Sequence, residues 1–367
     1  MTTPVTATAG APVRGRAAFH RLRVADVERL CDDAAAVTFD VPDDLAEEFA
    51  FAPGQSLTLR RVVDGVEERR SYSICSAVGE APRVGVRLVT GGLFSTWLVR
   101  EVAPGDEIEV GAPSGRFSPD LTEAARHVLV AAGSGITPVL SMAASLLRRT
   151  DSRVTLLYGN RRSDTVMFAD EIADLKDAFG PRFELVHVLS REPRESDLFT
   201  GRLDGAKMDA LLSGVVAADA VDHWWLCGPY GMVTDAREVL ARHGVEAERV
   251  HQELFFVEGA EPPPQARHED PEVEGPASEV TLVLDGRTTT LTLPQGVPVL
   301  DSAQRYRPDL PFACKGGVCG TCRVKVCDGE VTMRRNYALT PAEVASGYAL
   351  ACQSLPRTDT VTVDFDS

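Results

Sequence analysis

The chain has 367 residues, a length that favours two or three domains over a single core. Acidic residues outnumber basic ones by 54 to 38, and the net charge of −16 argues against non-specific binding to nucleic acid or to an anionic membrane. The first 20 residues contain no apolar core of the kind that a signal peptide has, so we expect a cytoplasmic protein in a reducing compartment.

Residues 1–19 offer little to bury, and we expect a disordered tail there. Residues 20–125 contain short alternating stretches such as AVTFDV, QSLTLRRVV, RVGVRLV and DEIEVGA, with Pro-Gly turns before two of them. Many short strands at this spacing predict an antiparallel β-barrel.

Two motifs of the barrel segment fit a flavin site when they are taken together. In RRSYSIC, Arg70 could pair with a flavin phosphate, Tyr72 could pack on the ring system, and Ser73 could bond its reactive nitrogen edge. In GGLFSTWL, the glycine pair allows close backbone approach before a helix that starts near Ser95 and can hold a pyrophosphate. Each motif alone also fits a plain strand or a plain turn.

Residues 126–256 alternate apolar strands with helical stretches, which predicts a parallel sheet in an α/β domain. The stretch 128–147 is uncharged and as long as a membrane helix, but the glycines and proline in its middle favour a strand, a turn and a helix. The motif AAGSGITP therefore opens the helix after the first strand, where such folds bind a ligand. The motif CGP, beginning at Cys227, ends a later strand at the same edge.

The second strand of this domain is followed by Asn160, Arg161 and Arg162, where a NAD site usually has an acid. Two arginines suit the 2′-phosphate of NADPH better, although solvated surface arginines are the alternative. Cys227 could lie beside the nicotinamide or be a small buried residue, and Phe255 could stack on the flavin or belong to the core.

Residues 257–279 contain five prolines and seven acidic residues, a composition typical of a linker. Residues 280–367 begin with a hairpin signature whose turn is Asp285-Gly286. This last segment contains Cys314, Cys319 and Cys322 in the C-x4-C-x2-C spacing of plant-type 2Fe–2S ferredoxins. Zinc and Rieske sites are disfavoured because no histidine follows residue 268, and disulfides are disfavoured by the compartment.

The fourth cluster ligand is either Cys327 or Cys352. The run CRVKVC reads as a strand, which places Cys327 roughly 16 Å from Cys322 and on the opposite side. We therefore expect Cys352 to complete the set and Cys327 to be a spare thiol. Because nicotinamides donate two electrons at once and the cluster accepts one, a flavin is expected between them.

The motifs stand in the order found in flavin reductases that consist of an FAD barrel, an NADP domain and a C-terminal plant-type ferredoxin, and residues 20–367 resemble this family. The run NYAL…GYALACQ and the ending TVTVDFD most resemble the reductase components of multicomponent phenylacetyl-CoA epoxidases. The resemblance implies FAD, a 2Fe–2S cluster and NADPH, with NADH less favoured. It also implies electron delivery, in phenylacetate catabolism, to the di-iron oxygenase subunits of an acyl-CoA epoxidase complex.

The expected catalytic residues are Ser73, Cys227 and Phe255. The expected residues around the flavin and the nucleotide are Arg70, Ser71, Tyr72, Ser73, Arg87, Val89, Gly91, Gly92, Leu93, Phe94, Ser95, Gly133, Ser134, Gly135, Thr137, Arg161, Arg162, Gly228 and Pro229. Two alternatives stay open: a reductase for a Rieske-type oxygenase such as ketosteroid hydroxylase, and a flavin redox sensor without a dedicated acceptor. Residues 280–367 contain nine acidic and nine basic residues, so Arg334 and Arg335 could face an acidic partner.

Overall fold

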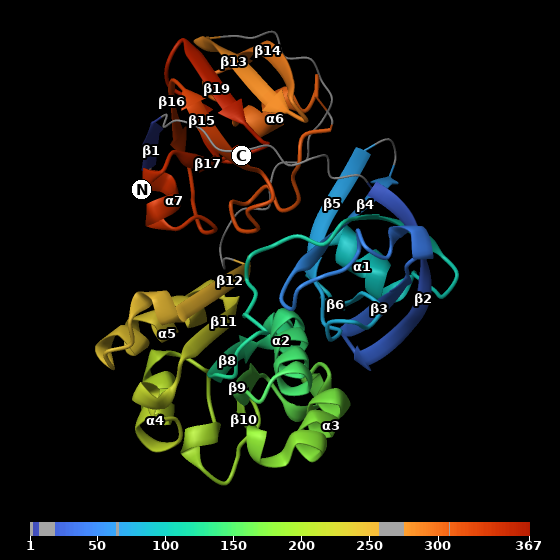
Figure 1. The fold of residues 1–367 in the computed structure, drawn as a ribbon, viewed down its shortest axis with the longest axis vertical. Coiled ribbons are helices and arrows are strands. Elements are labelled where there is room, and N and C mark those ends of the chain that lie inside the picture. The colour runs from blue at the N-terminus through green and yellow to red at the C-terminus, as the bar shows by residue number, and fades with distance from the viewer. Residues whose placement is uncertain (1–2, 7–18, 64–65, 257–274, 308) are drawn as a thin grey trace. The chain divides into compact units, whose positions relative to one another are not determined.

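The computed structural model describes residues 3–6, 19–63, 66–256, 275–307 and 309–367 (Figure 1). The chain divides into two compact units. The larger unit consists of Phe19–Arg61 and Arg70–Glu258, and the smaller one consists of Met1–Ala18, Val62–Arg69 and Gly259–Ser367.

The first domain is built on a six-stranded sheet with the spatial order β5-β4-β7-β2-β3-β6. Its strands are β2 (Phe19–Cys31), β3 (Ala34–Asp40), β4 (Ser56–Val63), β5 (Val66–Ser73), β6 (Arg83–Arg87) and β7 (Glu107–Gly111), and helix α1 is Leu93–Arg100. Just beyond β5, Ile74 pairs with Val84 of β6, so the edge strands meet and the sheet closes. Alternate side chains such as Leu57 and Leu59 fill the core. The expected antiparallel barrel is confirmed.

The second domain has a five-stranded parallel sheet with the order β10-β9-β8-β11-β12. Its strands are β8 (Arg126–Ala132), β9 (Arg153–Asn160), β10 (Phe183–Leu189), β11 (His223–Pro229) and β12 (Val250–Phe256). Helices α2 (Ile136–Arg149) and α3 (Ala169–Phe179) cover one face, and α4 (Gly205–Gly214) and α5 (Tyr230–Arg242) cover the other (Figure 1). The strand order changes direction between β8 and β11, and α/β sheets bind ligands at the carboxyl ends of such strands.

The uncharged stretch 128–147 forms most of β8, the short turn of helix Gly133–Gly135 and most of α2. The expectation of a strand, a turn and a helix is therefore confirmed. Within the described ranges, the structure contains no helix with the length and apolar character that crossing a membrane requires.

The C-terminal domain has a five-stranded mixed sheet in the order β14-β13-β19-β15-β17 and a three-stranded sheet β1-β16-β18. The strands are β1 (Thr3–Thr6), β13 (Ala277–Leu284), β14 (Arg287–Pro294), β15 (Arg323–Asp328), β16 (Glu330–Met333), β17 (Tyr348–Leu350), β18 (Ser354–Pro356) and β19 (Thr360–Asp364), with helices α6 (Val299–Ala303) and α7 (Pro341–Ala345). Asp285 and Gly286 both have positive φ values, 54° and 67°, as the predicted tight hairpin turn requires.

The first strand contradicts the expected disordered tail over part of its length. β1 pairs antiparallel with β16, whose other edge is occupied by β18. A free strand edge offers unpaired N–H and C=O groups, and Thr3–Thr6 satisfies them. The tail expectation is therefore wrong for these four residues. Residues 7–18 and most of the expected linker, 257–274, lie outside the described residues.

Candidate functional site

The RRSYSIC motif lies at the end of β5 and divides between two faces of that strand. Because side chains alternate along a strand, Arg70 and Tyr72 share one face, and Ser71 and Ser73 share the other. The Tyr72 ring lies 6.1 Å from the Phe94 ring of α1, measured between centroids. Ser73 is buried and reaches the parallel-sheet domain. One face of β5 is thus suited to packing against an aromatic cofactor. The other face is suited to hydrogen-bonding the reactive edge of that cofactor.

Ser73 meets two residues from the ends of β11 and β12. Its hydroxyl donates a hydrogen bond to Glu253, with 3.2 Å between Oγ and Oε2. Glu253 in turn pairs with Cys227 in the β11–β12 register. Burial raises the pKa of Glu253 to about 7, although the bond from Ser73 opposes this shift. A hydroxyl, a carboxyl that is partly protonated at neutral pH and a thiol therefore lie together and can hold or pass a proton.

Two further features of this corner matter for the expected catalytic residues. Burial, followed by the charge of Glu253, raises the pKa of the Cys227 thiol well above its usual value, so this thiol stays neutral. Phe255, which lies two residues beyond Glu253 on β12, leaves 37% of its surface exposed. Sequence reasoning missed Glu253. Its signal was a single acid within the apolar end of the run HQELFF.

The GGLFSTWL motif forms a tight loop before α1. Gly91 has a φ of +73°, which favours glycine, and Gly92 is the residue before the helix. The Ser95 hydroxyl accepts the Val89 N–H at 3.1 Å and donates to the Gly92 carbonyl at 3.1 Å, so it holds the loop in shape. The first amides of a helix have no intrahelical acceptor and can bind an anion. With the exposed side chains of Val89 and Leu93 beside it, this loop fits the pyrophosphate of FAD.

The AAGSGITP motif approaches the end of β11 too closely for any residue but glycine. A Cβ atom on Gly135 would lie 2.1 Å from the Cys227 carbonyl oxygen and 3.0 Å from the Gly228 backbone nitrogen. Gly133 has a φ of +56°, and its carbonyl accepts a hydrogen bond from the Tyr158 hydroxyl at 3.1 Å. The expected nucleotide-binding turns after β8 and β11 are therefore brought side by side.

Two expected cofactor residues lie at the junction between the barrel and the parallel sheet. Thr137 is buried, its hydroxyl donates to Ser134 at 3.0 Å, and its methyl group packs where Gly85 of β6 has no side chain. Arg87 pairs with Asp33 at 3.1 Å and donates to the Thr165 carbonyl. The protein itself satisfies both side chains, which the isolated motifs could not reveal.

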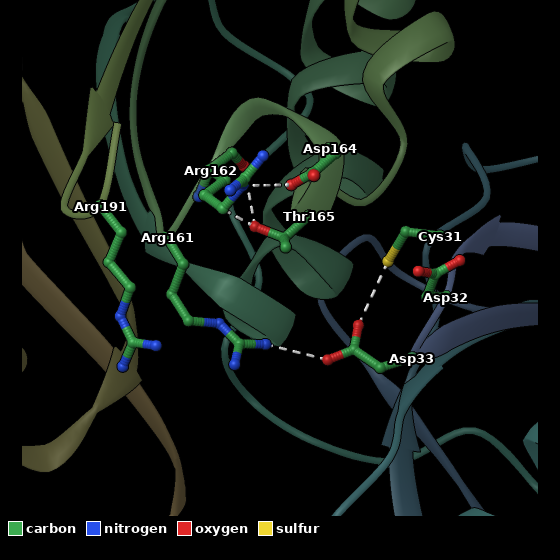
Figure 2. A pocket seen from close by; sticks show the side chains of 8 residues that line it. All are labelled: Cys31, Asp32, Asp33, Arg161, Arg162, Asp164, Thr165 and Arg191. Carbon is green, nitrogen blue, oxygen red and sulfur yellow. Dashed lines mark hydrogen bonds and ion pairs between the residues drawn. The ribbon is translucent and has the colours of Figure 1, made fainter. Parts of the chain in front are cut away.

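A cavity of about 350 Å³ lies next to this junction, with its arginines gathered on one side and its aspartates on the other (Figure 2). Its lining residues are Cys31, Asp32, Asp33, Arg161, Arg162, Asp164, Thr165 and Arg191. Arg161 and Arg162 follow β9 directly, and Arg191 follows β10, where its N–H bonds the Arg161 carbonyl at 2.8 Å. Sequence reasoning missed Arg191, whose only signal was its place just after a strand. Three guanidinium groups around one cavity suit a phosphate.

Four cysteines gather in the C-terminal domain as two pairs. The Cys314 and Cys319 thiols are hydrogen-bonded to each other, and so are those of Cys322 and Cys352. The bond from Cys319 and three backbone amides lower the pKa of Cys314. Those amides belong to Gly316, Val318 and Cys319 and lie 3.3, 3.5 and 3.4 Å from the Cys314 sulfur.

This arrangement fits a 2Fe–2S cluster better than a single metal ion. No group of three or more His, Cys, Asp or Glu side chains in the described part of the chain could hold one ion. Two thiol pairs suit two irons, and amides aimed at sulfur stabilise negative charge on it. Lys315, Gly317 and Gly320 have positive φ values in the loop, 50°, 79° and 69°. Cys327, by contrast, is exposed near the far end of β15.

The chain matches three domain families: an oxidoreductase FAD-binding domain over residues 21–118, an oxidoreductase NAD-binding domain over 129–238, and a 2Fe-2S iron-sulfur cluster binding domain over 282–357. It is 41% identical to a subunit of the 1,2-phenylacetyl-CoA epoxidase of Escherichia coli strain K12, over 95% of this chain and 98% of that protein. It is 34% identical to the 3-ketosteroid-9-alpha-monooxygenase ferredoxin reductase component of Mycobacterium tuberculosis, over 94% of this chain and 95% of that protein. The solved structure of phthalate dioxygenase reductase has the same fold, with a TM-score of 0.58 at 24% identity over 94% and 98% of the chains.

We predict that Cys352→Ser loses the iron–sulfur cluster, because a hydroxyl is a poor substitute for a thiolate ligand. Cys327→Ser is the matched control, since it removes an exposed thiol of the same domain. Iron content per chain and the visible spectrum of the purified variants measure the outcome. Iron lost from Cys327→Ser but retained in Cys352→Ser would refute this ligand set.

We predict that Glu253→Gln changes how stability depends on pH. A carboxyl whose pKa rises from 4.5 to about 7 on folding contributes stability that is complete below pH 4.5 and lost as pH rises toward 7. The neutral amide avoids this loss, which is on the order of 2 kcal/mol after allowing for partial exposure of the side chain. Urea unfolding should show that the free energy of unfolding of the variant, relative to that of the unmodified protein, is higher at pH 8 than at pH 5. An equal difference at both pH values would contradict the raised pKa.

Proposed function

Because the chain belongs to the reductase components of multicomponent oxygenases, which join FAD-, NAD- and 2Fe–2S-binding domains in one polypeptide, we propose that it carries electrons from NADPH to a di-iron oxygenase that epoxidises phenylacetyl-CoA. That it is an oxidoreductase with these three cofactor domains follows from the family. The choice of NADPH, the roles of individual residues and the identity of the oxygenase are the proposal. The expected cytoplasmic location also stays a prediction.

The residues of the barrel fit the roles of holding and orienting FAD, which accepts a pair of electrons and releases them singly. The loop of Gly91 and Gly92 and the first amides of α1 would bind its pyrophosphate. Arg70 and Tyr72 share the face of β5 toward α1, where Tyr72 packs near Phe94. The remaining expected flavin contacts are Ser71, Val89, Leu93 and Ser95.

The corner formed by Ser73, Glu253 and Cys227 would control protons beside the nicotinamide. Ser73 donates to Glu253, so its hydroxyl has a fixed direction, and the carboxyl can take up or release a proton near neutral pH. Cys227 stays a neutral, buried thiol and would shape the pocket. Phe255 is exposed enough to cover the site when no coenzyme is bound.

The nucleotide would lie along the carboxyl ends of β8, β9 and β11. The turns Gly133–Gly135 and Gly228–Pro229 would approach its phosphates, and Arg161 and Arg162 its 2′-phosphate. Ser134 belongs to the first turn, whereas the Thr137 hydroxyl is already bonded to Ser134 and would support the turn from behind.

The identity of 41% over nearly the full length of an epoxidase subunit supports the oxygenase partner. The cysteine loop has a basic border that suits an acidic docking surface. Arg334 and Arg335 are exposed, and the Arg335 carbonyl would lie 3.3 Å from a Cβ atom on Gly317 of that loop. A Rieske-type ketosteroid oxygenase is the second candidate partner, supported by the 34% identity to a ketosteroid monooxygenase reductase.

We predict that the double variant Arg161→Ala, Arg162→Ala raises the KM for NADPH far more than the KM for NADH. A charge-assisted contact to a phosphate contributes about 1.5–3 kcal/mol, which corresponds to roughly ten- to a hundredfold. Steady-state reduction of a dye acceptor with each coenzyme measures the effect. Equal changes for both coenzymes would mean that these arginines do not recognise the 2′-phosphate.

We predict that the protein supports NADPH-driven epoxidation of phenylacetyl-CoA when it is mixed with epoxidase oxygenase subunits, and that Arg335→Glu slows this reaction several-fold. The same variant should reduce a small dye at the normal rate, because flavin reduction occurs in the other compact unit. A full rate of epoxidation by the variant would exclude the basic border as a docking surface. Activity with a ketosteroid oxygenase and none with the epoxidase would refute the proposed partner.

A further inference from the structure

The cavity lined by Arg161, Arg162 and Arg191, here called the arginine cavity, also contains aspartates from different parts of the chain. Three arginines and three aspartates line it, so their formal charges cancel. Arg162 pairs with Asp164, its near neighbour in sequence, at 3.2 Å. Arg161 pairs at 2.9 Å with Asp33, which lies 128 residues earlier, in the turn between β2 and β3 of the barrel (Figure 2).

Asp33 is held firmly in place. One carboxylate oxygen accepts hydrogen bonds from Arg87 Nε at 3.1 Å and from the Cys31 thiol at 3.3 Å, and the other pairs with Arg161. Partial burial opposes ionisation, but the charge of Arg87, the bond from Cys31 and the charge of Arg161 outweigh it and lower the pKa of Asp33. Asp33 is therefore a fixed negative charge at physiological pH.

A fixed carboxylate at this place acts in opposite directions on the two coenzymes. A 2′-phosphate that approaches Arg161 meets a carboxylate already bonded to that guanidinium and must displace or share it. The ribose of NADH instead carries a 2′-hydroxyl, and an acid at the end of the second strand is the usual acceptor for it. The residues directly after β9 are arginines, and the acid bonded to Arg161 comes from the barrel.

We propose that Asp33 sets the coenzyme preference of this pocket by competing with the 2′-phosphate of NADPH for Arg161 and by offering an acceptor to the ribose hydroxyl of NADH. This inference rests on the proposed role of Arg161 in nucleotide binding. It assigns a specificity-determining residue to the barrel, although the nucleotide belongs to the other domain.

The test measures binding to the FAD-loaded full chain by isothermal titration calorimetry with 2′,5′-ADP and with 5′-ADP, which differ in the 2′-phosphate. Asp33→Asn should tighten 2′,5′-ADP binding about five- to tenfold and leave 5′-ADP binding unchanged or weaker, because one nearby negative charge is removed. Asp33→Glu keeps the charge and should stay within about twofold of the unmodified protein for both ligands.

Asp32→Asn is the matched control. Asp32 lines the same cavity from the same turn, and its backbone carbonyl, which the substitution keeps, accepts a bond from Arg100 at 2.9 Å. If the preference for 2′,5′-ADP over 5′-ADP reflects only the overall electrostatic field of the cavity, Asp32→Asn will shift this preference as much as Asp33→Asn does. That outcome overturns the proposal. A much smaller shift in Asp32→Asn than in Asp33→Asn supports a direct effect of the pair between Asp33 and Arg161.

A double-mutant cycle with Arg161→Ala separates this inference from the proposed function. If Arg161 binds the 2′-phosphate, Arg161→Ala should weaken 2′,5′-ADP binding and abolish the gain from Asp33→Asn. If Arg161→Ala affects both ligands equally, the proposed phosphate pocket itself is wrong. If Arg161→Ala is selective but Asp33→Asn leaves the preference unchanged, the pocket stands and the role of Asp33 is refuted.

Discussion

The close packing of α2 against β6, at a point where Gly85 lacks a side chain, is the contact on which the larger unit depends. A Cβ atom on Gly85 would lie 2.5 Å from Thr137 Cγ2 and 2.8 Å from Phe168 Cζ, so any larger residue would push the barrel away from the parallel sheet. Ser73 reaches Glu253, and Asp33 reaches Arg161, across this same junction. The corner formed by Ser73, Glu253 and Cys227 and the cavity lined by Arg161 and Asp33 therefore both need the two domains at a fixed separation.

The sequence was most informative where the structure is decided locally. Alternating apolar residues marked the strands, the glycines of AAGSGITP marked a turn before a helix, and Asp285-Gly286 marked a hairpin. Each of these depends on backbone conformation or on a short hydrophobic period, and both can be read from a few adjacent residues. The cysteine spacing is equally local, because one loop carries three of the four thiols.

The sequence was least informative where a contact joins distant segments. Glu253 gains its raised pKa from burial beside Ser73, 180 residues away, and nothing in either motif indicates the other. Asp33 lies in an ordinary turn of the barrel and comes to line the same cavity as Arg161 only through the fold. Arg87 and Thr137 show the reverse case, since residues that looked available for a ligand already have protein partners.

The pairing of β1 with β16 links the first residues of the chain to its last domain. A C-terminal fragment produced without Thr3–Thr6 would expose the edge of β16 that β1 covers. Open strand edges recruit other chains, so such a fragment would be prone to self-association in the test tube. To produce the C-terminal domain alone, the segment containing Thr3–Thr6 should therefore be fused to that domain. Simple truncation would leave the segment out. An affinity tag on the N-terminus would likewise adjoin the cluster-binding domain, although the barrel follows it in the sequence.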